Sequence, residues 1–133
     1  MVPYHLSYDP RDGLITLTVV RAILDSEAAR LASDITAAIG QARRAGPVRM
    51  LCDFREAPSL SPRSRGKLLD TMTALRETSD RTAIVVTTCV RKVKANPMMD
   101  DQTRTFVSPA AAMTWLNAWV GAPATRPPTA LAG

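Results

Sequence analysis

Apolar and polar residues follow one another along this chain in patterns that predict about five strands and three helices. Residues 4–8 and 14–20 alternate as strands do, and the Asp12-Gly13 pair between them predicts an antiparallel hairpin. Continuous apolar runs at 48–54 and 82–88 are typical of buried strands in a parallel sheet. A short β-branched run at 103–107 predicts the last strand.

Three other segments repeat apolar residues at helical spacing. The first helix is predicted to begin near Ser26, as its N-cap, and to stop before Gly46-Pro47. Ser61-Pro62 and Ser108-Pro109 each supply a capping hydroxyl and a first-turn proline for a further helix. Residues 89–102 read as a loop with room for one helical turn. The order β-β-α-β-α-β-β-α predicts an α/β fold in which helices cover a mixed sheet of about five strands.

Length and composition favour a single small globular domain. The chain has 133 residues, of which 46% are apolar, and we assign the domain to 1–120 and a Pro-rich tail to 121–133. No apolar run reaches the length of a membrane span and the N-terminus lacks a secretory pattern, so we expect a cytoplasmic protein without membrane insertion. The net charge of +5 is modest, and we expect no nucleic-acid partner.

No motif in the chain specifies a reaction. Cys52 and Cys89 lie in or beside apolar runs, outside any Cys/His cluster, and are interpreted as small buried residues. His5 is the only histidine and belongs to the first strand. Asp53 has no histidine or second acid nearby in the sequence and is interpreted as a loop anchor. We therefore expect no enzymatic activity, no cofactor and no metal site.

The end of the strand at 48–54 and the helix start that follows it form the candidate site. Ligands and partners of open α/β sheets are met at the carboxyl ends of the strands. If the strands at 48–54 and 82–88 are parallel neighbours, the cations that follow each strand share one edge, which suits a phosphate or an acidic protein surface. The alternative to a binding site is a solvated basic rim whose charge is balanced by nearby acids. The candidate residues are Asp53, Arg55, Ser59, Ser61, Arg63, Ser64, Arg65, Lys67, Arg91, Lys92 and Lys94.

A second hypothesis is a small-ligand carrier. Met98 and Met99, together with Met72, are flexible thioethers suited to lining a cavity between the second helix and the 89–102 loop, although core filling is their more common role. Trp115 and Trp119 lie four residues apart on one helical face, and we expect them to pack on the sheet or on a partner subunit of a homodimer.

The order of elements and the ending of the chain resemble the STAS/SpoIIAA-like superfamily. The resemblance covers residues 14–120 and rests on the strands MLCDF and AIVVTT and on the final TFVSPAAAMTWL. In the last strand and helix, the residues that stand in the family's typical places are Phe106, Ser108, Ala111 or Ala112, Trp115 and Leu116. It implies a SpoIIAA-like fold and a non-enzymatic regulatory or binding domain that acts through a protein partner.

The sequence departs from this family at the start of the second helix. Anti-sigma-factor antagonists carry Asp-Ser-Ser-Gly there, with a serine that a partner kinase phosphorylates. The equivalent residues here are 61–64, and the place of the phosphoacceptor falls on Pro62 or Arg63, which have no hydroxyl. A shifted alignment leaves Ser59, Ser61 or Ser64 as substitutes. The edge reads better as a fixed basic docking surface than as a kinase substrate.

Overall fold

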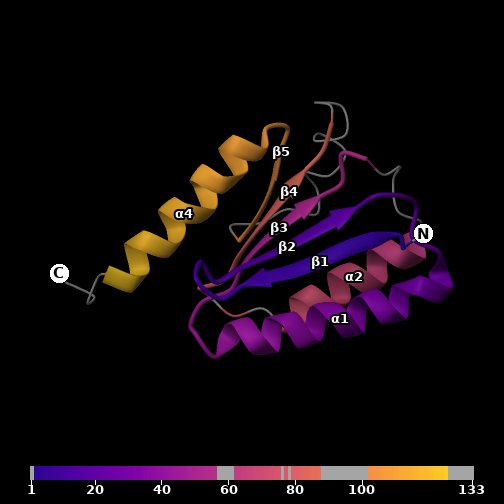
Figure 1. Ribbon diagram of the computed structural model, residues 1–133, viewed down its shortest axis with the longest axis horizontal. Coiled ribbons are helices and arrows are strands. Elements are labelled where there is room, and N and C mark those ends of the chain that lie inside the picture. The colour runs from indigo at the N-terminus through magenta and orange to yellow at the C-terminus, as the bar shows by residue number, and fades with distance from the viewer. Residues whose placement is uncertain (1, 57–61, 76, 78, 88–101, 126–133) are drawn as a thin grey trace.

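The structure is a computed structural model that describes residues 2–56, 62–75, 77, 79–87 and 102–125. Its sheet has five strands in the order β1-β2-β3-β4-β5, which confirms the predicted mixed α/β sheet (Figure 1). The hairpin strands β1 and β2 are antiparallel, and every later neighbour in the sheet is parallel. The strands are β1 (Tyr4–Asp9), β2 (Leu14–Val19), β3 (Arg49–Asp53), β4 (Arg81–Val85) and β5 (Thr103–Phe106).

Three helices among the described residues cover the two faces of this sheet. Helices α1 (Asp25–Arg43) and α2 (Pro62–Leu75) pack against each other on one face, and α4 (Pro109–Thr125) lies on the other (Figure 1). Helix α4 extends to Thr125, past residue 120. In the part of the chain that the structure describes, no helix is both long and apolar enough to cross a membrane.

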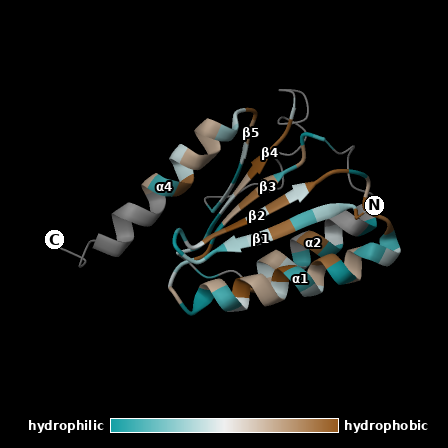
Figure 2. Ribbon diagram, viewed as in Figure 1, coloured by the Kyte–Doolittle hydropathy of each residue, from teal (hydrophilic) through white to brown (hydrophobic). Residues whose placement is uncertain are grey.

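The larger core lies between the sheet and the pair α1 and α2. Ile15, Leu17 and Val19 alternate along β2 and are fully buried there, as the sequence pattern predicts. Figure 2 shows hydrophobic stretches, in brown, along the strands of the sheet. Leu14, which breaks that alternation, belongs instead to the cluster under α4. Met72 packs partly buried against the larger core, so it fills the interior as methionines commonly do.

The smaller core lies between α4 and strands β4 and β5. Its buried members are Ala83, Val85, Ala112 and Leu116. Trp115 packs at its border, with its ring 5.6 Å from that of Phe106 in β5. The predicted packing of Trp115 on the sheet is therefore confirmed, whereas the side chain of Trp119 lies outside the described residues.

The helix ends match the sequence at one cap and differ at another. Ser108 caps α4, because its Oγ accepts a hydrogen bond of 3.2 Å from the N–H of Ala111. The predicted Ser26 cap of α1 is wrong: the helix begins at Asp25, directly after Leu24. The N–H of Leu24 donates instead to Glu27 Oε1 at 2.9 Å. The Glu27 carboxylate thus satisfies the N–H of the residue directly before the helix, as the acidic member of a capping box does.

Candidate functional site

The carboxyl ends of β3 and β4 meet at one edge of the sheet. Asp53, the last residue of β3, pairs with Val85 in β4, and the N–H of Phe54 donates to the Val85 carbonyl at 2.9 Å. The sequence predicts a shared edge only if these two strands are parallel neighbours, and they are. We use the name β3–α2 edge for the described candidate residues, which are Asp53 and Arg55 at the end of β3 and Arg63 and Lys67 at the start of α2.

Asp53 and Arg55 form a closed pair at the end of β3. Arg55 Nε and Nη2 approach the two carboxylate oxygens of Asp53 at 3.0 and 2.8 Å, and the N–H of Arg55 donates to Oδ1 at 3.0 Å. Hydrogen bonds from the Arg55 side chain lower the pKa of Asp53, although partial burial opposes them. The Asp53 carboxylate is thus ionised, and both of its oxygens already accept hydrogen bonds from Arg55. It anchors the turn, as the sequence suggests, and is poorly placed to accept a proton from a substrate.

The start of α2 presents exposed positive charge. Arg63 and Lys67 are exposed and lie four residues apart, hence on the same flank of the helix. The first turn of α2 contains no acidic residue. Cations near a helix N-terminus oppose its dipole, each at a cost of about 0.3–1 kcal/mol, so they add nothing to the stability of the helix.

The other predicted members of the site are not placed by the structure. Ser64 and Arg65 belong to α2, but their side chains lie outside the described residues. The remainder are wholly outside those residues: Ser59, Ser61, Arg91, Lys92, Lys94 and, for the ligand hypothesis, Met98 and Met99. Whether these cations join the β3–α2 edge stays a prediction.

No reactive constellation accompanies this edge in the described ranges. Cys52 is buried in β3, and burial raises the pKa of its thiol to about 12. It is protonated at neutral pH and therefore a poor nucleophile. Among the described residues, no three His, Cys, Asp or Glu side chains gather closely enough to hold a metal ion.

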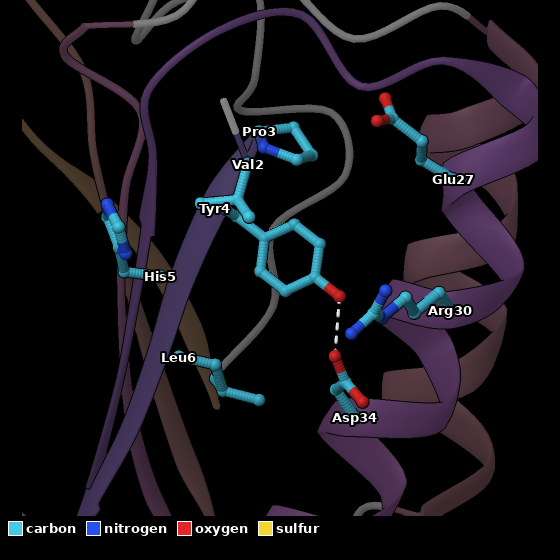
Figure 3. Close-up of a pocket in the computed structure, with 8 residues that line it drawn as sticks. All are labelled: Val2, Pro3, Tyr4, His5, Leu6, Glu27, Arg30 and Asp34. Atoms are coloured by element: carbon cyan, nitrogen blue, oxygen red, sulfur yellow. Dashed lines mark hydrogen bonds between the residues drawn. The ribbon is translucent and has the colours of Figure 1, made fainter.

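A groove that the sequence reasoning missed lies between β1 and α1 (Figure 3). Its volume is about 530 Å³. We call it the β1–α1 groove, and its lining consists of Val2, Pro3, Tyr4, His5, Leu6, Glu27, Arg30 and Asp34. The ligand hypothesis expected a cavity elsewhere, beside α2 and the 89–102 loop. The groove joins two segments about thirty residues apart in sequence, a pairing that no local pattern reveals.

Tyr4 crosses this groove from the strand to the helix. Its hydroxyl donates a hydrogen bond of 2.5 Å to Asp34 Oδ2 (Figure 3). Burial, reinforced by the Asp34 carboxylate, raises the pKa of Tyr4 to about 12. His5 belongs to the same strand but points away from Asp34. The polar centre of the groove is therefore a neutral phenol held against a carboxylate.

The remaining charges of the groove differ in how they are paired. Glu27 forms an ion pair of 2.8 Å with Arg21 and also accepts the Leu24 N–H. Arg30 is exposed, and no carboxylate of the described chain lies within ion-pair distance of it. The groove thus combines an apolar floor with one available cation.

The fold has clear counterparts among solved structures, although no family model and no curated protein matches the sequence. SpoIIAA, an anti-sigma factor antagonist in its unphosphorylated form, aligns with a TM-score of 0.64 and 14% identity over 86% of this chain and 97% of that protein. An anti-sigma factor antagonist from Mycobacterium paratuberculosis aligns with a TM-score of 0.65 and 15% identity over 86% and 94%.

An uncharacterised protein with a SpoIIAA-like fold from Shewanella loihica PV-4 aligns with a TM-score of 0.60 and 17% identity over 85% of this chain and 91% of that one. These matches confirm the SpoIIAA-like fold that the sequence resemblance implies. At such low identity they establish the fold, while the site must be argued from this chain's own residues.

Proposed function

We propose that this chain is a non-enzymatic regulatory domain that binds an acidic surface of a protein partner through the β3–α2 edge. The observation that carries the proposal is the exposed pair Arg63 and Lys67 on one flank of α2, without an acid in the first turn. Such cations contribute little to folding and are available to steer an acidic partner. The structural similarity to two anti-sigma factor antagonists, which are protein-interacting regulators, supports it.

The chemistry of the edge also favours binding over catalysis. Asp53 is neutralised by Arg55, and the Cys52 thiol is buried and protonated. Neither group is suited to act as a base or a nucleophile at neutral pH. Docking through fixed charges requires only that the cations be exposed.

The start of α2 supports docking that does not depend on a phosphoserine at the family position. Helix α2 begins at Pro62, and Arg63 follows it with an exposed side chain. Neither residue offers a hydroxyl to a kinase. Where the SpoIIAA-like family places a switchable charge, this chain carries a permanent positive one, so we propose constitutive binding.

The test compares two charge-matched double variants. Arg63→Gln with Lys67→Gln removes two cations at the β3–α2 edge. Arg11→Gln with Arg44→Gln removes two exposed cations that precede the amino ends of the parallel strands β2 and β3, opposite the end where Asp53 lies. Proteins that co-purify with the wild type from the source cell are quantified for both variants. We expect the first pair to weaken binding of an acidic partner roughly tenfold and to flatten its salt dependence, while the second changes neither. Equal recovery by all three proteins would refute docking at this edge.

The alternative function is carriage of a small apolar or phosphorylated molecule. Native mass spectrometry of the purified protein tests it directly, because a bound molecule adds a defined mass. A bound molecule that survives in the Arg63→Gln, Lys67→Gln variant would favour a site elsewhere, such as the β1–α1 groove.

A further inference from the structure

The two edges of the sheet differ in how well they are protected against further strand pairing. Strand β5 is four residues long and carries the exposed Arg104, whose guanidinium carbon lies 5.9 Å from the centre of the Trp115 ring. Short, charged edges of this kind discourage pairing with another strand. Strand β1 is six residues long, and it contains no lysine, arginine or proline.

The register of β1 is also continuous. All six residues pair with β2 without a bulge, from Tyr4 opposite Val19 to Asp9 opposite Leu14. Within the described ranges, β1 has no strand neighbour except β2, so its outer side presents free backbone N–H and C=O groups. A long, regular edge strand whose ionised carboxylate, Asp9, stands only at its last position is a template for another strand.

The side chains of β1 divide cleanly between its two faces. Tyr4, Leu6 and Tyr8 are partly buried and pack against the larger core on the α1 side. His5 and Ser7 are exposed on the opposite side. A strand added to β1 must repeat this division, because opposite residues of an antiparallel pair point to the same face.

The sequence of β1 itself meets that requirement. When two copies run antiparallel about a two-fold axis at Leu6, Leu6 faces Leu6, Tyr4 faces Tyr8, and His5 faces Ser7. Within residues 4–8, every apolar residue then meets an apolar one and every polar residue a polar one, while Asp9 at the end of β1 faces Pro3 just before the strand. A slip of one residue would oppose apolar and polar positions along the whole strand, so the register is well specified.

We propose that β1 is a dimerisation edge at which a second copy of this chain continues the sheet. In this arrangement Tyr8 of the second copy lies beside Tyr4, at the mouth of the β1–α1 groove. The exposed Arg30 on α1 is then available to the aromatic ring. The groove thereby becomes the place that receives the second copy's aromatic side chain. This interface is separate from the β3–α2 edge, because β1 contributes no residue to that edge.

The test uses the variant Ser7→Lys, which places a charge at an exposed position of the edge strand and leaves its buried face unchanged. Its control is Val107→Lys, which adds the same charge at an exposed position directly after β5. Light scattering and native mass spectrometry over a roughly hundredfold concentration range give the dimer dissociation constant of each protein. We expect Ser7→Lys to raise it at least tenfold and Val107→Lys to leave it unchanged.

Hydrogen exchange locates the interface in the folded proteins. Amides of β1 should gain protection as the wild type dimerises, whereas those of β5 should not, and Ser7→Lys should lose the concentration dependence. A wild type that stays monomeric throughout overturns the proposal. So does a dimer that Ser7→Lys does not weaken. A monomer whose β1 amides are protected only by another protein overturns it in favour of a partner's strand.

Discussion

The guanidinium of Arg43 donates two hydrogen bonds to the carboxylate of Asp80, from Nη1 to Oδ1 at 2.5 Å and from Nη2 to Oδ2 at 2.7 Å. Asp80 is buried, and it also accepts the backbone N–H groups of Val48 and Glu77 at 2.9 and 2.8 Å. One carboxylate therefore ties together the end of α1, the residue before β3 and the segment that leads into β4. This arrangement fixes the amino ends of β3 and β4.

Replacement of Asp80 by Asn should be strongly destabilising. The change leaves the Arg43 guanidinium without its carboxylate in a largely buried place, where breaking such a pair costs about 3–5 kcal/mol. Urea unfolding followed by circular dichroism measures the loss in free energy of unfolding. Glu77→Gln is the control: Glu77 is exposed and contacts Arg43 Nε at 3.4 Å, so it should cost less than about 1 kcal/mol. Equal urea midpoints for wild type and Asp80→Asn would contradict this role.

The same carboxylate predicts loss of stability in acid. Burial raises the pKa of Asp80, but hydrogen bonds from Arg43 and from the Glu77 and Val48 amides outweigh it and lower the pKa overall. The folded protein thus binds this proton less readily than the unfolded chain, whose Asp pKa is about 3.9. The stabilisation is complete above that value and is lost as pH falls through the folded pKa. The free energy of unfolding of Asp80→Asn should vary less over this range; parallel curves would count against the assignment.

Tyr4 predicts a second, alkaline transition. Its pKa is raised to about 12, whereas an unfolded tyrosine titrates near 10. The folded state holds the phenolic proton more tightly, so the stabilisation is present below about pH 10 and is lost as pH rises towards 12. Phenolate absorbance in a Tyr8→Phe background follows Tyr4 alone. Asp34→Asn, which replaces the hydrogen-bonded carboxylate, should bring the pKa of Tyr4 back towards its ordinary value. An ordinary pKa in the parent background would disprove the Tyr4–Asp34 contact.

Cys52 should resist thiol reagents while the protein is folded. Its thiol is buried and its pKa is raised to about 12, so almost no thiolate forms at neutral pH. In a Cys89→Ser background, labelling by a maleimide should proceed only as fast as the protein unfolds, and urea should restore the full rate. Rapid labelling of the folded protein would show that β3 is open to solvent, which is inconsistent with this core.

Local patterns predicted the elements because each element follows rules that its own residues obey. The alternation of Ile15, Thr16 and Leu17 shows which face of β2 is buried, and Ser108 caps a helix by reaching only three residues along. Even the shared edge of β3 and β4 followed from the order of elements, since parallel strands joined by a helix end on the same side.

Contacts between distant segments were beyond those patterns. Ser26 is a suitable cap by residue type, but the helix begins one residue earlier, after Leu24, whose N–H donates to the Glu27 carboxylate that Arg21 pairs with. The bond between Tyr4 and Asp34 joins a strand to the middle of a helix, so neither residue carries a local sign of it. A capping hydroxyl accepts from an N–H inside the first turn, whereas the Glu27 carboxylate accepts from the N–H of Leu24 before the helix, and the residue types alone do not tell which of the two a helix start uses.

The two helical layers differ in how firmly they are packed against the sheet. Within the described ranges, fourteen buried residues join the sheet to α1 and α2, whereas four join it to α4, and two of those four are alanines. Because burial of apolar surface supplies most of the cohesion, the described residues hold the α4 layer to the sheet with less apolar contact than they hold the layer of α1 and α2. Brief excursions of α4 would bare Val85 while the hairpin and the opposite layer remain folded. The protein would then pass through a partly open form long before it unfolds.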